Sequence, residues 1–530
     1  MILNVDCHFI SEVLMGSEWL NLGQMLAVNA AKFPDKIAVK DRSRSCTYSQ
    51  FNKRVNKLAN TLLSLNLLKG DKISCLLENC TEIVELYMAC AKTGVVLNPI
   101  NFRLSTNDIA YIADNADSKF FFTEPEFTPV VDAIKSKLSK VRHFFLTGKK
   151  EMPGYAGYET TIANSPETEP GSTVNPEDTW VILYTSGTTG KPKGVIRSHE
   201  SYTAFYLINA VDFGFTENDI CMTVMPLCHV NSTFFSFIFP YLGGTIYVHP
   251  ARKFDPVEIL EIIQKEKISF ISLIPTHYSI ILSVPENVRA KYNVSSVTKL
   301  LCSSAPARGD IKKRIMDYFC GVRLYEGYGS TEAGIVTVLK PHEQMVKLGS
   351  IGRESCGTAL IKLLDEKGRE VPVGEVGEIF SRSPMLFNEY YKLPEKTAAA
   401  FRNGWFSAGD LGRKDENGYF YIVDRKDNMI ITGGEHVYPS EVEEVISKHP
   451  KVFETAVIGV PDEKWGETVI AIVILKDCCQ AEPDEIIDFC KDKMAGFKKP
   501  KKAVFIKSNE MPRTASGKIL HRELRKRYAL

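Results

Sequence analysis

The sequence predicts an α/β protein with a large N-terminal domain of two doubly wound, mixed or parallel sheets, a small β-barrel-like subdomain and a small α+β C-terminal domain. Three observations predict this fold class. Helix and strand patterns alternate from about residue 20 to 340, short strands and frequent turns fill residues 349–423, and an α+β pattern follows the charged segment 424–427. Alternating helices and strands indicate parallel sheets with helices on both faces. The expected domains are residues 1–426 and 427–530.

The alternating region combines helical patterns with short apolar strands. Residues 48–65 and 82–93 repeat apolar side chains with helical spacing. The expected strands are residues 72–77, 95–97, 180–184, 269–274 and 299–303. Residues 150–178 are rich in Gly, Pro, Glu and Thr, so we expect a connecting loop there.

The second half of the chain has a different texture. Turn sequences that separate short strands are typical of a small antiparallel barrel. These turns lie at residues 365–368, 373–375 and 415–418. The elements expected in the C-terminal domain are helices at 440–448 and 484–494, strands at 455–460 and 468–475, and a basic segment at 498–502.

Length and composition are those of a multidomain globular enzyme. A chain of 530 residues exceeds one ordinary domain, and 44% hydrophobic with 24% charged residues is a normal globular balance. The 65 basic residues offset 64 acidic ones, so nothing predicts a nucleic-acid partner. The 13 scattered cysteines form no C-x-x-C pair and favour reduced thiols, hence a cytoplasmic location. We expect neither a signal peptide nor a transmembrane segment, and a homodimer is one option for the oligomeric state.

A loop rich in glycine, hydroxyls and lysine follows the expected strand 180–184. Residues 185–194 read Thr-Ser-Gly-Thr-Thr-Gly-Lys-Pro-Lys-Gly, and such loops hold phosphate through backbone N–H groups, hydroxyls and ammonium charge. It is not a Walker A loop, because only Thr188 and Thr189 separate Gly187 from Gly190. A flexible polar surface loop is the alternative for this segment taken alone.

Further motifs follow the loop in a fixed order. They are residues 225–229 (Met-Pro-Leu-Cys-His), 303–306 (Ser-Ser-Ala-Pro), 328–332 (Tyr-Gly-Ser-Thr-Glu), 405–410 (Trp-Phe-Ser-Ala-Gly-Asp), 424–427 (Asp-Arg-Lys-Asp), 433–435 (Gly-Gly-Glu) and 512–518 (Pro-Arg-Thr-Ala-Ser-Gly-Lys). With these motifs the chain resembles the adenylate-forming superfamily of acyl-CoA synthetases, adenylation domains and firefly luciferase. Residues 222–226 with His229 look similar to crotonobetaine/carnitine-CoA ligases, and medium-chain acyl-CoA synthetases are also similar.

The resemblance implies ATP, Mg²⁺ and coenzyme A as cofactors, a carboxylic acid as substrate, and a set of site residues. The catalytic residues would be Lys518, Glu332, Thr185 and His229, and the metal ligands Glu332 and Thr185. ATP and coenzyme A would contact Thr185, Ser186, Gly187, Thr188, Thr189, Gly190, Lys193, Ser304, Ala305, Pro306, Glu326, Gly327, Tyr328, Gly329, Ser330, Thr331, Asp410, Ile422, Arg425, Gly433, Gly434, Glu435 and Lys518. Asp427 would be the hinge. The substrate pocket would contain His229, Asn231, Ser303, Gly327 and Gly334.

The chemistry of individual residues agrees with these roles. A carboxylate such as Glu332 suits a hard cation, and Tyr328 offers a flat face to adenine. Asp410 can accept both ribose hydroxyls, and Lys518 is a long ammonium arm on a Ser-Gly loop. Taken singly, Tyr328 could be a core aromatic, Asp410 a turn residue, Lys518 a solvated charge and His229 a packed core histidine.

The resemblance implies a two-step reaction. A carboxylate attacks the α-phosphorus of ATP and expels pyrophosphate, with Lys518 bridging the two reactants. A thiol then attacks the acyl-adenylate and AMP leaves, after the small domain has rotated as a mobile lid about Asp427. The glycine segment 433–435 would line the pantetheine tunnel. Positioning and charge neutralisation are the protein's main contributions to such phosphoryl chemistry.

The substrate acid is open between several classes. A crotonobetaine- or carnitine-like acid, a short-to-medium-chain fatty acid and an aryl acid all fit the mixed aromatic and polar segments expected around the pocket. The segment 229–233 lacks the acid that amino-acid-activating relatives carry, which disfavours an α-amino acid. A stand-alone adenylation enzyme that loads a carrier protein is the main alternative function, and a non-catalytic nucleotide-binding protein is a further one.

Overall fold

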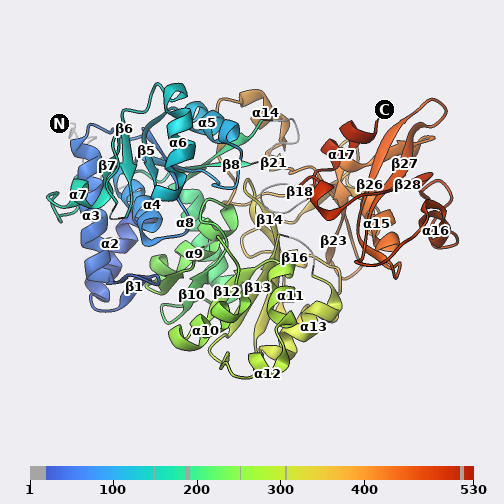
Figure 1. Cartoon of the computed structure of the whole chain (residues 1–530), viewed down its shortest axis with the longest axis horizontal. Coiled ribbons are helices and arrows are strands. Elements are labelled where there is room, and N and C mark those ends of the chain that lie inside the picture. The colour runs from blue at the N-terminus through green and yellow to red at the C-terminus, as the bar shows by residue number, and fades with distance from the viewer. Residues whose placement is uncertain are drawn as a thin grey trace, which may run out of the picture.

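A computed structural model describes residues 20–148, 150–185, 191–250, 252–304, 307–513 and 519–529. It confirms the predicted α/β fold class. Two large mixed sheets with helices packed on them and a small antiparallel sheet build the chain up to about residue 425, and the last hundred residues form a separate α+β unit (Figure 1).

The larger sheet has nine strands and is parallel in its centre. Its strands in spatial order are β16 (Arg353–Glu354), β15 (Gly334–Leu339), β14 (Arg323–Ser330), β13 (Lys299–Ser303), β12 (Phe270–Leu273), β10 (Ile220–Thr223), β11 (Thr245–Val248), β1 (Ile37–Lys40) and β2 (Ser45–Thr47). Strands β14 to β1 run parallel, and β15, β16 and β2 add antiparallel edges. Parallel strands need helical crossovers, which is why helices alternate with strands in this region.

The second sheet has eight strands. In spatial order they are β19 (Glu389–Tyr390), β9 (Lys193–Ser198), β8 (Thr179–Thr185), β4 (Val96–Pro99), β3 (Lys72–Leu76), β5 (Ser118–Thr123), β6 (His143–Leu146) and β7 (Ala156–Gly157). Strands β8 to β7 run parallel, whereas β9 is antiparallel to both β8 and β19. The predicted phosphate loop therefore connects two neighbouring strands of this sheet.

Buried helices join the two sheets into one core. Side chains from both sheets and from α2 (Leu22–Lys32), α3 (Tyr48–Ser64), α4 (Thr81–Thr93), α8 (His199–Phe213) and α9 (Val230–Leu242) form a single apolar cluster. Helix α9 is apolar nearly all round because it lies inside this cluster. In the part of the chain that the structure covers, no helix has the length and apolarity needed to cross a bilayer.

Further helices cover the outer faces of the sheets. They are α5 (Thr106–Asn115), α6 (Thr128–Ile134), α7 (Tyr158–Ile162), α10 (Pro256–Glu266), α11 (Pro275–Ser283), α12 (Glu286–Arg289) and α13 (Gly309–Tyr318). Helices α10, α11 and α13 share an apolar cluster with the nine-stranded sheet, and α5 and α6 share one with the eight-stranded sheet. Both sheets are thus covered on two faces, as a parallel sheet requires.

The predicted small antiparallel unit precedes the C-terminal part in sequence. It is a four-stranded antiparallel sheet of β17 (Lys362–Leu364), β18 (Gly377–Phe380), β22 (Asp410–Lys414) and β23 (Phe420–Arg425). Strand β19 of the eight-stranded sheet lies in sequence between two of its strands, β18 and β22. The hairpin of β20 (Phe401–Arg402) and β21 (Trp405–Phe406) and helix α14 (Pro394–Ala399) accompany it.

The C-terminal part has its own core. Its sheet contains β25 (Glu435–Val437), β24 (Ile430–Thr432), β27 (Gly466–Leu475), β26 (Val452–Asp462) and β28 (Lys502–Phe505). Its helices are α15 (Pro439–Ser447), α16 (Pro483–Phe489) and α17 (His521–Tyr528). One apolar cluster lies on the face covered by α15 and α16, and another includes Leu524 of α17. All described members of both clusters come from residue 430 onward.

Three local expectations were wrong. The segment 150–178 is not all loop, because it contains β7 and α7, and Tyr158 of α7 is buried with its hydroxyl donating to Glu85 (2.6 Å). The helix expected at 484–494 ends at Phe489, since Asp492 takes a left-handed conformation (φ 60°). Strand β26 is longer than expected because it pairs with β27 along its length. Tertiary pairing, which local pattern does not encode, decided these boundaries.

Candidate active site

The predicted phosphate loop lies at the end of the eight-stranded sheet. Strand β8 ends at Thr185, and β9 begins at Lys193, and these two residues are cross-strand partners. Both side chains are half-buried. The predicted contacts Ser186, Gly187, Thr188, Thr189 and Gly190 lie outside the described residues. The hairpin therefore brings a hydroxyl and an ammonium group together at the base of the loop.

Lys193 lies above an aromatic ring and within a charged cluster. Its Nζ is 4.2 Å from the centroid of the Tyr390 ring. Burial lowers the pKa of Lys193, and charged groups of both signs act on it as well. These groups are Glu332, Lys396, Asp427 and Arg425. Charged groups that follow β14, lie in α14 and lie at and after the end of β23 thus act electrostatically on Lys193.

Glu332, the predicted metal ligand, is held by two contacts. Its carboxylate Oε1 accepts a hydrogen bond from the Tyr390 hydroxyl (2.8 Å), and its backbone carbonyl accepts one from the N–H of Phe387 (2.7 Å). Because Lys193 lies over the same Tyr390 ring, one tyrosine joins the predicted metal carboxylate to the predicted phosphate lysine. Burial and Glu332 together raise the pKa of Tyr390 above its usual value, so Tyr390 remains a neutral donor.

Glu332 and Thr185 fit a Mg²⁺ ion that is bound together with nucleotide phosphates. Mg²⁺ is usually bound by one or two carboxylates and substrate phosphates rather than by an all-protein cage. Glu332 supplies one carboxylate, and Thr185 supplies a hydroxyl on the neighbouring hairpin. Over the described ranges no cluster of three or more His, Cys, Asp or Glu side chains is placed to hold a metal by itself.

Exposed Arg425 and buried Asp410 form an ion pair beside this cluster. They are cross-strand partners in β22 and β23, and Arg425 Nε lies 2.7 Å from Asp410 Oδ1. The Tyr328 hydroxyl donates to the other oxygen, Oδ2, at 2.7 Å. Burial, with Asp410 adding to it, raises the pKa of Tyr328 well above the usual range. Both predicted ribose residues and the predicted adenine residue therefore share one hydrogen-bonded network, and Ile422 packs against the same apolar cluster as Tyr328.

The segment after β13 and the strand β14 carry the next predicted contacts. Ser304 has a left-handed backbone (φ 68°), which is uncommon for a residue other than glycine. The predicted contacts Ala305 and Pro306 lie outside the described residues. A Cβ on Gly329 would meet the carbonyl oxygen of Gly334 at 1.9 Å, so only glycine fits between β14 and β15. The Ser330 hydroxyl accepts a hydrogen bond from the N–H of Ala333 (3.0 Å), which fixes this turn.

Glu326 has an internal role in the structure. Its carboxylate forms a buried ion pair with Lys312 of α13 and accepts a hydrogen bond from the N–H of Ala307 (3.1 Å). Burial raises the pKa of Glu326, and the charge of Lys312 opposes that shift. A nucleotide contact through this carboxylate stays a prediction.

The predicted pocket residues Asn231 and Ser303 touch each other. Asn231 at the start of α9 donates to the Ser303 hydroxyl at the end of β13 (2.7 Å), and the Ser272 hydroxyl of β12 donates to the Asn231 oxygen (3.0 Å). We call these three residues the polar trio. His229 Nδ1 accepts from the N–H of Asn231 (3.3 Å) and caps α9. Gly327 pairs with Ser303 in the sheet, and Gly334 packs on Phe205 and Met385.

The hinge segment is hydrogen-bonded on both sides. Lys426 donates its N–H to the Gly409 carbonyl of the small sheet (2.8 Å), whereas Arg525 of α17 donates to the Asp427 carbonyl (2.7 Å). Ser440 of α15 donates its N–H to Asp424 (2.8 Å). Lys426 is thus bonded to the small sheet and Asp427 to the C-terminal part, while Ser440 also bonds across this point to Asp424.

The glycine segment begins the C-terminal sheet. Gly433 and Gly434 have left-handed backbones (φ 59° and 84°), and the Gly433 N–H donates to the Trp465 carbonyl (2.7 Å). Glu435 is exposed. The predicted catalytic Lys518 lies outside the described residues.

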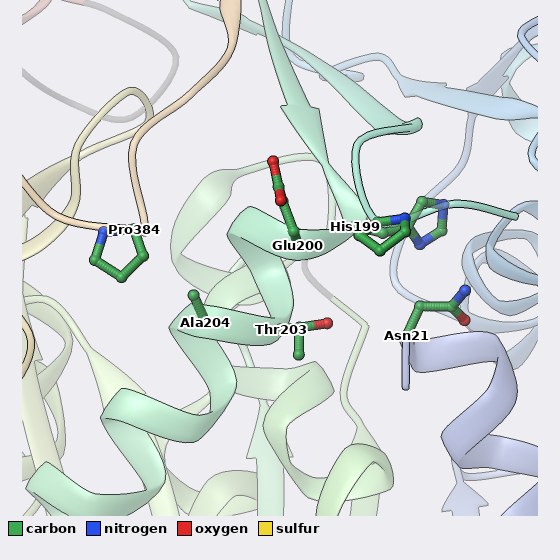
Figure 2. Close-up of a pocket in the computed structure, with 7 residues that line it drawn as sticks. Asn21, His199, Glu200, Thr203, Ala204 and Pro384 are labelled. Carbon is green, nitrogen blue, oxygen red and sulfur yellow. The ribbon is translucent and has the colours of Figure 1, made fainter. Parts of the chain in front are cut away.

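A cavity of about 400 Å³ lies apart from the predicted site residues. Figure 2 shows it beside the first turns of α8, with Pro384 on one side and Asn21 on the other. His199 lines it and is 2% exposed, with no hydrogen bond to its Nε2. Burial lowers the pKa of His199 to about 4, so the imidazole is neutral at ordinary pH.

Three residues at the site were missed from sequence. Tyr390 is 58 positions from its partner Glu332, Ser272 lies in an ordinary apolar strand, and Arg197 looks like one basic residue in β9. Nothing in their local sequence marks them. Only the pairing of distant strands brings them to the site.

The described arrangement matches known proteins over nearly the whole chain. The sequence model for AMP-binding enzyme matches residues 26–391, and that for the AMP-binding enzyme C-terminal domain matches residues 441–518. The chain is 33% identical to a feruloyl-CoA synthase from Amycolatopsis sp, covering 96% of this chain and 99% of that protein. It is 32% identical to the long-chain-fatty-acid–CoA ligase FadD13 from Mycobacterium tuberculosis, with coverage of 96% and 99%.

A solved structure has the same fold. It is the crystal structure of the anthranilate CoA ligase AuaEII in complex with anthranoyl-AMP, with a TM-score of 0.86 and 28% identity. The match covers 96% of this chain and 97% of that one.

Proposed function

The chain belongs to the AMP-binding enzyme family and is an AMP-forming acyl-CoA ligase that uses ATP, Mg²⁺ and coenzyme A, and from this premise we propose how its residues act and which acid it takes. The acid is a carboxylic acid of modest size, aryl or aliphatic, that carries no charge apart from its carboxylate. The domain boundary lies between residues 426 and 427. The protein is cytoplasmic, a location supported by free cysteines throughout the described chain.

One observation carries the assignment of the adenylation site. Tyr390 connects the Glu332 carboxylate with the Lys193 ammonium, close to the Asp410–Arg425 pair. Glu332 and Thr185 hold the metal, Lys193 and the loop hold the phosphates, and Asp410 with Arg425 holds the ribose. When bound, Mg²⁺ neutralises charge on the phosphate oxygens.

In the first step the substrate carboxylate attacks the α-phosphorus of ATP. A bond forms between the carboxylate oxygen and phosphorus, and the bond to pyrophosphate breaks. The protein contributes by holding two anions in line and neutralising their charge, which is worth several kcal/mol in such reactions. Lys518 is proposed to bridge the two anions in this step.

In the second step a thiol replaces AMP. The sulfur of coenzyme A forms a bond to the acyl carbon, and the bond to the AMP oxygen breaks. Lys518 has no further role, so the C-terminal part rotates about Asp427. Lys426 bonds to Gly409 of the small sheet and Asp427 to Arg525 of α17, which supports a hinge between them; the rotation would break the bond of Ser440 to Asp424.

The polar trio supports an uncharged acyl group. Asn231, Ser303 and Ser272 carry no charge and satisfy one another by hydrogen bonds. A buried ammonium or trimethylammonium group needs an acidic or aromatic partner, and within the described residues no carboxylate bonds to the trio. Likeness to a feruloyl-CoA synthase and an anthranilate CoA ligase supports an aryl acid, and likeness to a long-chain-fatty-acid–CoA ligase supports an aliphatic one. The expected likeness to crotonobetaine/carnitine-CoA ligases is not confirmed.

The test of substrate class is mass spectrometry of products from a pool of acids. The protein is incubated with ATP, Mg²⁺ and hydroxycinnamates, benzoates, indoleacetate, fatty acids, crotonobetaine and carnitine, with and without coenzyme A. We expect acyl-AMP without coenzyme A and acyl-CoA plus AMP with it, from the uncharged acids. A product from carnitine or crotonobetaine alone would overturn the substrate proposal. Adenylate that coenzyme A never converts would point to a carrier-protein thiol.

The test of the two-step assignment separates the half-reactions. Lys518→Ala should abolish acyl-AMP formation and largely spare thioester formation from supplied acyl-AMP. Asp427→Pro should do the converse, because proline restricts the backbone rotation of the hinge. Equal loss of both half-reactions in Lys518→Ala would contradict the assignment.

A further inference from the structure

A buried arginine bonds to the backbone next to the predicted metal ligand Glu332. Arg197 is the last residue but one of β9 and is 0% exposed. Its Nη1 donates to the carbonyl of Thr331 (2.8 Å), and its Nη2 donates to the carbonyl of Met385 (2.6 Å). One side chain thus joins two segments that are distant in sequence.

Arg197 is buried as a cation without an acidic partner. In the described part of the chain no carboxylate forms an ion pair with it, and its Nε has no hydrogen bond. Its Cζ lies 5.0 Å from the centroid of the Tyr202 ring and 4.8 Å from that of Phe234. Burial lowers the pKa of Arg197 to about 10, which leaves it charged at neutral pH. Burial of a charge is costly, so the hydrogen bonds and ring contacts of Arg197 must offset that cost.

The two carbonyls that Arg197 holds flank Glu332. Thr331 immediately precedes Glu332, and Met385 lies two residues before Phe387, whose N–H donates to the Glu332 carbonyl (2.7 Å). Arg197 therefore fixes the backbone on both sides of the contact that holds Glu332.

The second segment borders a cavity. Pro384, which precedes Met385, is among the residues that line the cavity of about 400 Å³. Figure 2 shows Pro384 facing Ala204 of α8 across this space. On the other side a Cβ at Gly334 would meet Met385 Cβ at 2.8 Å, so that contact is already close. Met385 itself is 0% exposed within the main apolar cluster, and the Arg197 bond to its carbonyl ties this packed segment to β9.

We propose that Arg197 is a positioning residue for Glu332, one that sets the metal-binding carboxylate through the carbonyls of Thr331 and Met385. Its charge also acts on the Glu332 carboxylate, since the two groups lie close enough to interact electrostatically. Arg197 touches neither nucleotide nor acid. The inference rests on the proposed role of Glu332 as the metal ligand, and it adds a residue that the motifs do not include.

The test measures how Mg²⁺ changes ATP binding. Calorimetry gives the Kd of ATP in excess Mg²⁺ and in EDTA for the wild type and for Arg197→Met, Arg197→Gln and Arg197→Lys. Loss of a residue that orients a metal ligand typically costs about 10- to 100-fold in metal affinity. We expect Arg197→Met to lose at least about tenfold of the Mg²⁺-dependent gain, with the Kd in EDTA unchanged. Arg197→Lys, which keeps the charge, should retain more of the gain than Arg197→Gln.

A second readout distinguishes positioning from general support of the fold. Thioester formation from supplied acyl-AMP should stay within about threefold of wild type in a folded variant, because that step does not use Glu332 as metal ligand. The matched control is Arg289→Met. Like Arg197, Arg289 donates to a backbone carbonyl (Val284, 2.9 Å) and lies over an aromatic ring (Tyr318). It differs in its place, because it lies in α12 and, among the described residues, does not bond to the segments around Glu332. Arg289→Met should keep the full Mg²⁺-dependent gain.

The outcomes separate this inference from the proposed function. An unchanged Mg²⁺-dependent gain in folded Arg197→Met, or an equal loss of both half-reactions, would overturn the positioning role alone. A wild type in which Mg²⁺ does not strengthen ATP binding would overturn the role of Glu332 and this inference together. If Arg197→Met does not fold, Arg197→Lys is compared with Arg197→Gln instead. An equal Mg²⁺-dependent gain in ATP affinity in these two variants would refute the contribution of the Arg197 charge.

Discussion

Removal of the Tyr390 hydroxyl tests the proposed adenylation site most directly. Tyr390→Phe removes the hydrogen bond to Glu332 Oε1 (2.8 Å) and keeps the ring that Lys193 covers at 4.2 Å. A hydrogen bond to a charged group contributes about 1.5–3 kcal/mol, which corresponds to roughly 10- to 150-fold in an equilibrium constant. The ring remains packed on Phe387 (4.8 Å between centroids), so the fold should persist.

The assay follows pyrophosphate release during acyl-AMP formation as Mg²⁺ is varied. We expect Tyr390→Phe to raise the Mg²⁺ concentration at half-maximal rate by roughly 10- to 100-fold, because the carboxylate loses the donor that orients it. Thioester formation from supplied acyl-AMP should be nearly unaffected.

The matched control is the neighbouring tyrosine. The Tyr391 hydroxyl donates to Asp117 (2.8 Å) and does not contact Glu332, so Tyr391→Phe should leave the Mg²⁺ dependence unchanged. If Tyr390→Phe and Tyr391→Phe have the same Mg²⁺ dependence as the wild type, Tyr390 does not orient a metal ligand and the reasoning fails.

Three further predictions concern buried polar groups. Lys312→Met should lower the free energy of unfolding by about 3–5 kcal/mol in urea, since it leaves the buried Glu326 carboxylate unpaired; a change under about 1 kcal/mol would mean that Glu326 is already neutral. Burial lowers the pKa of His199 to about 4. Between pH 6.5 and 4 the unfolded state therefore binds more protons than the folded state, so the free energy of unfolding falls as the pH falls. The loss relative to pH above 6.5 is about 2–3 kcal/mol at pH 4. His199→Gln should flatten that dependence in thermal unfolding against pH, and an identical slope would contradict it. Asn231→Ala should raise KM for the acid by roughly tenfold through loss of its bonds in the polar trio, with KM for ATP unchanged; an equal rise in both would place Asn231 outside the pocket.

The fold class could be predicted from the sequence, and several residues that the motifs single out lie in contact with one another in the structure. Alternating helix and strand patterns specify parallel sheets because a parallel connection needs a crossover, and the nine- and eight-stranded sheets have this arrangement. Asp410 and Arg425 were predicted from two separate motifs and are 15 residues apart in sequence. The pairing of β22 with β23 brings Arg425 Nε to 2.7 Å from Asp410 Oδ1. Glycine at 329 reflects local backbone geometry, which sequence records directly.

Contacts between distant segments could not be predicted in this way. Tyr390, Ser272 and Arg197 belong to strands whose local patterns encode only burial. The internal pairing of Glu326 with Lys312 likewise depends on how α13 packs against β14. Local pattern carries no information on which distant side chain will be the partner.

The sequence by itself determined the order of elements, the phosphate-binding loop chemistry and the family of reaction, because each depends on residue types at short spacing. Only the tertiary structure decided which groups lie beside Glu332, since Tyr390 bonds to Glu332 from β19 and Arg197 bonds to the preceding Thr331 from β9, two strands that pair with each other. Strand pairing is set by burial of the whole core, and burial is a property of the folded chain rather than of any segment.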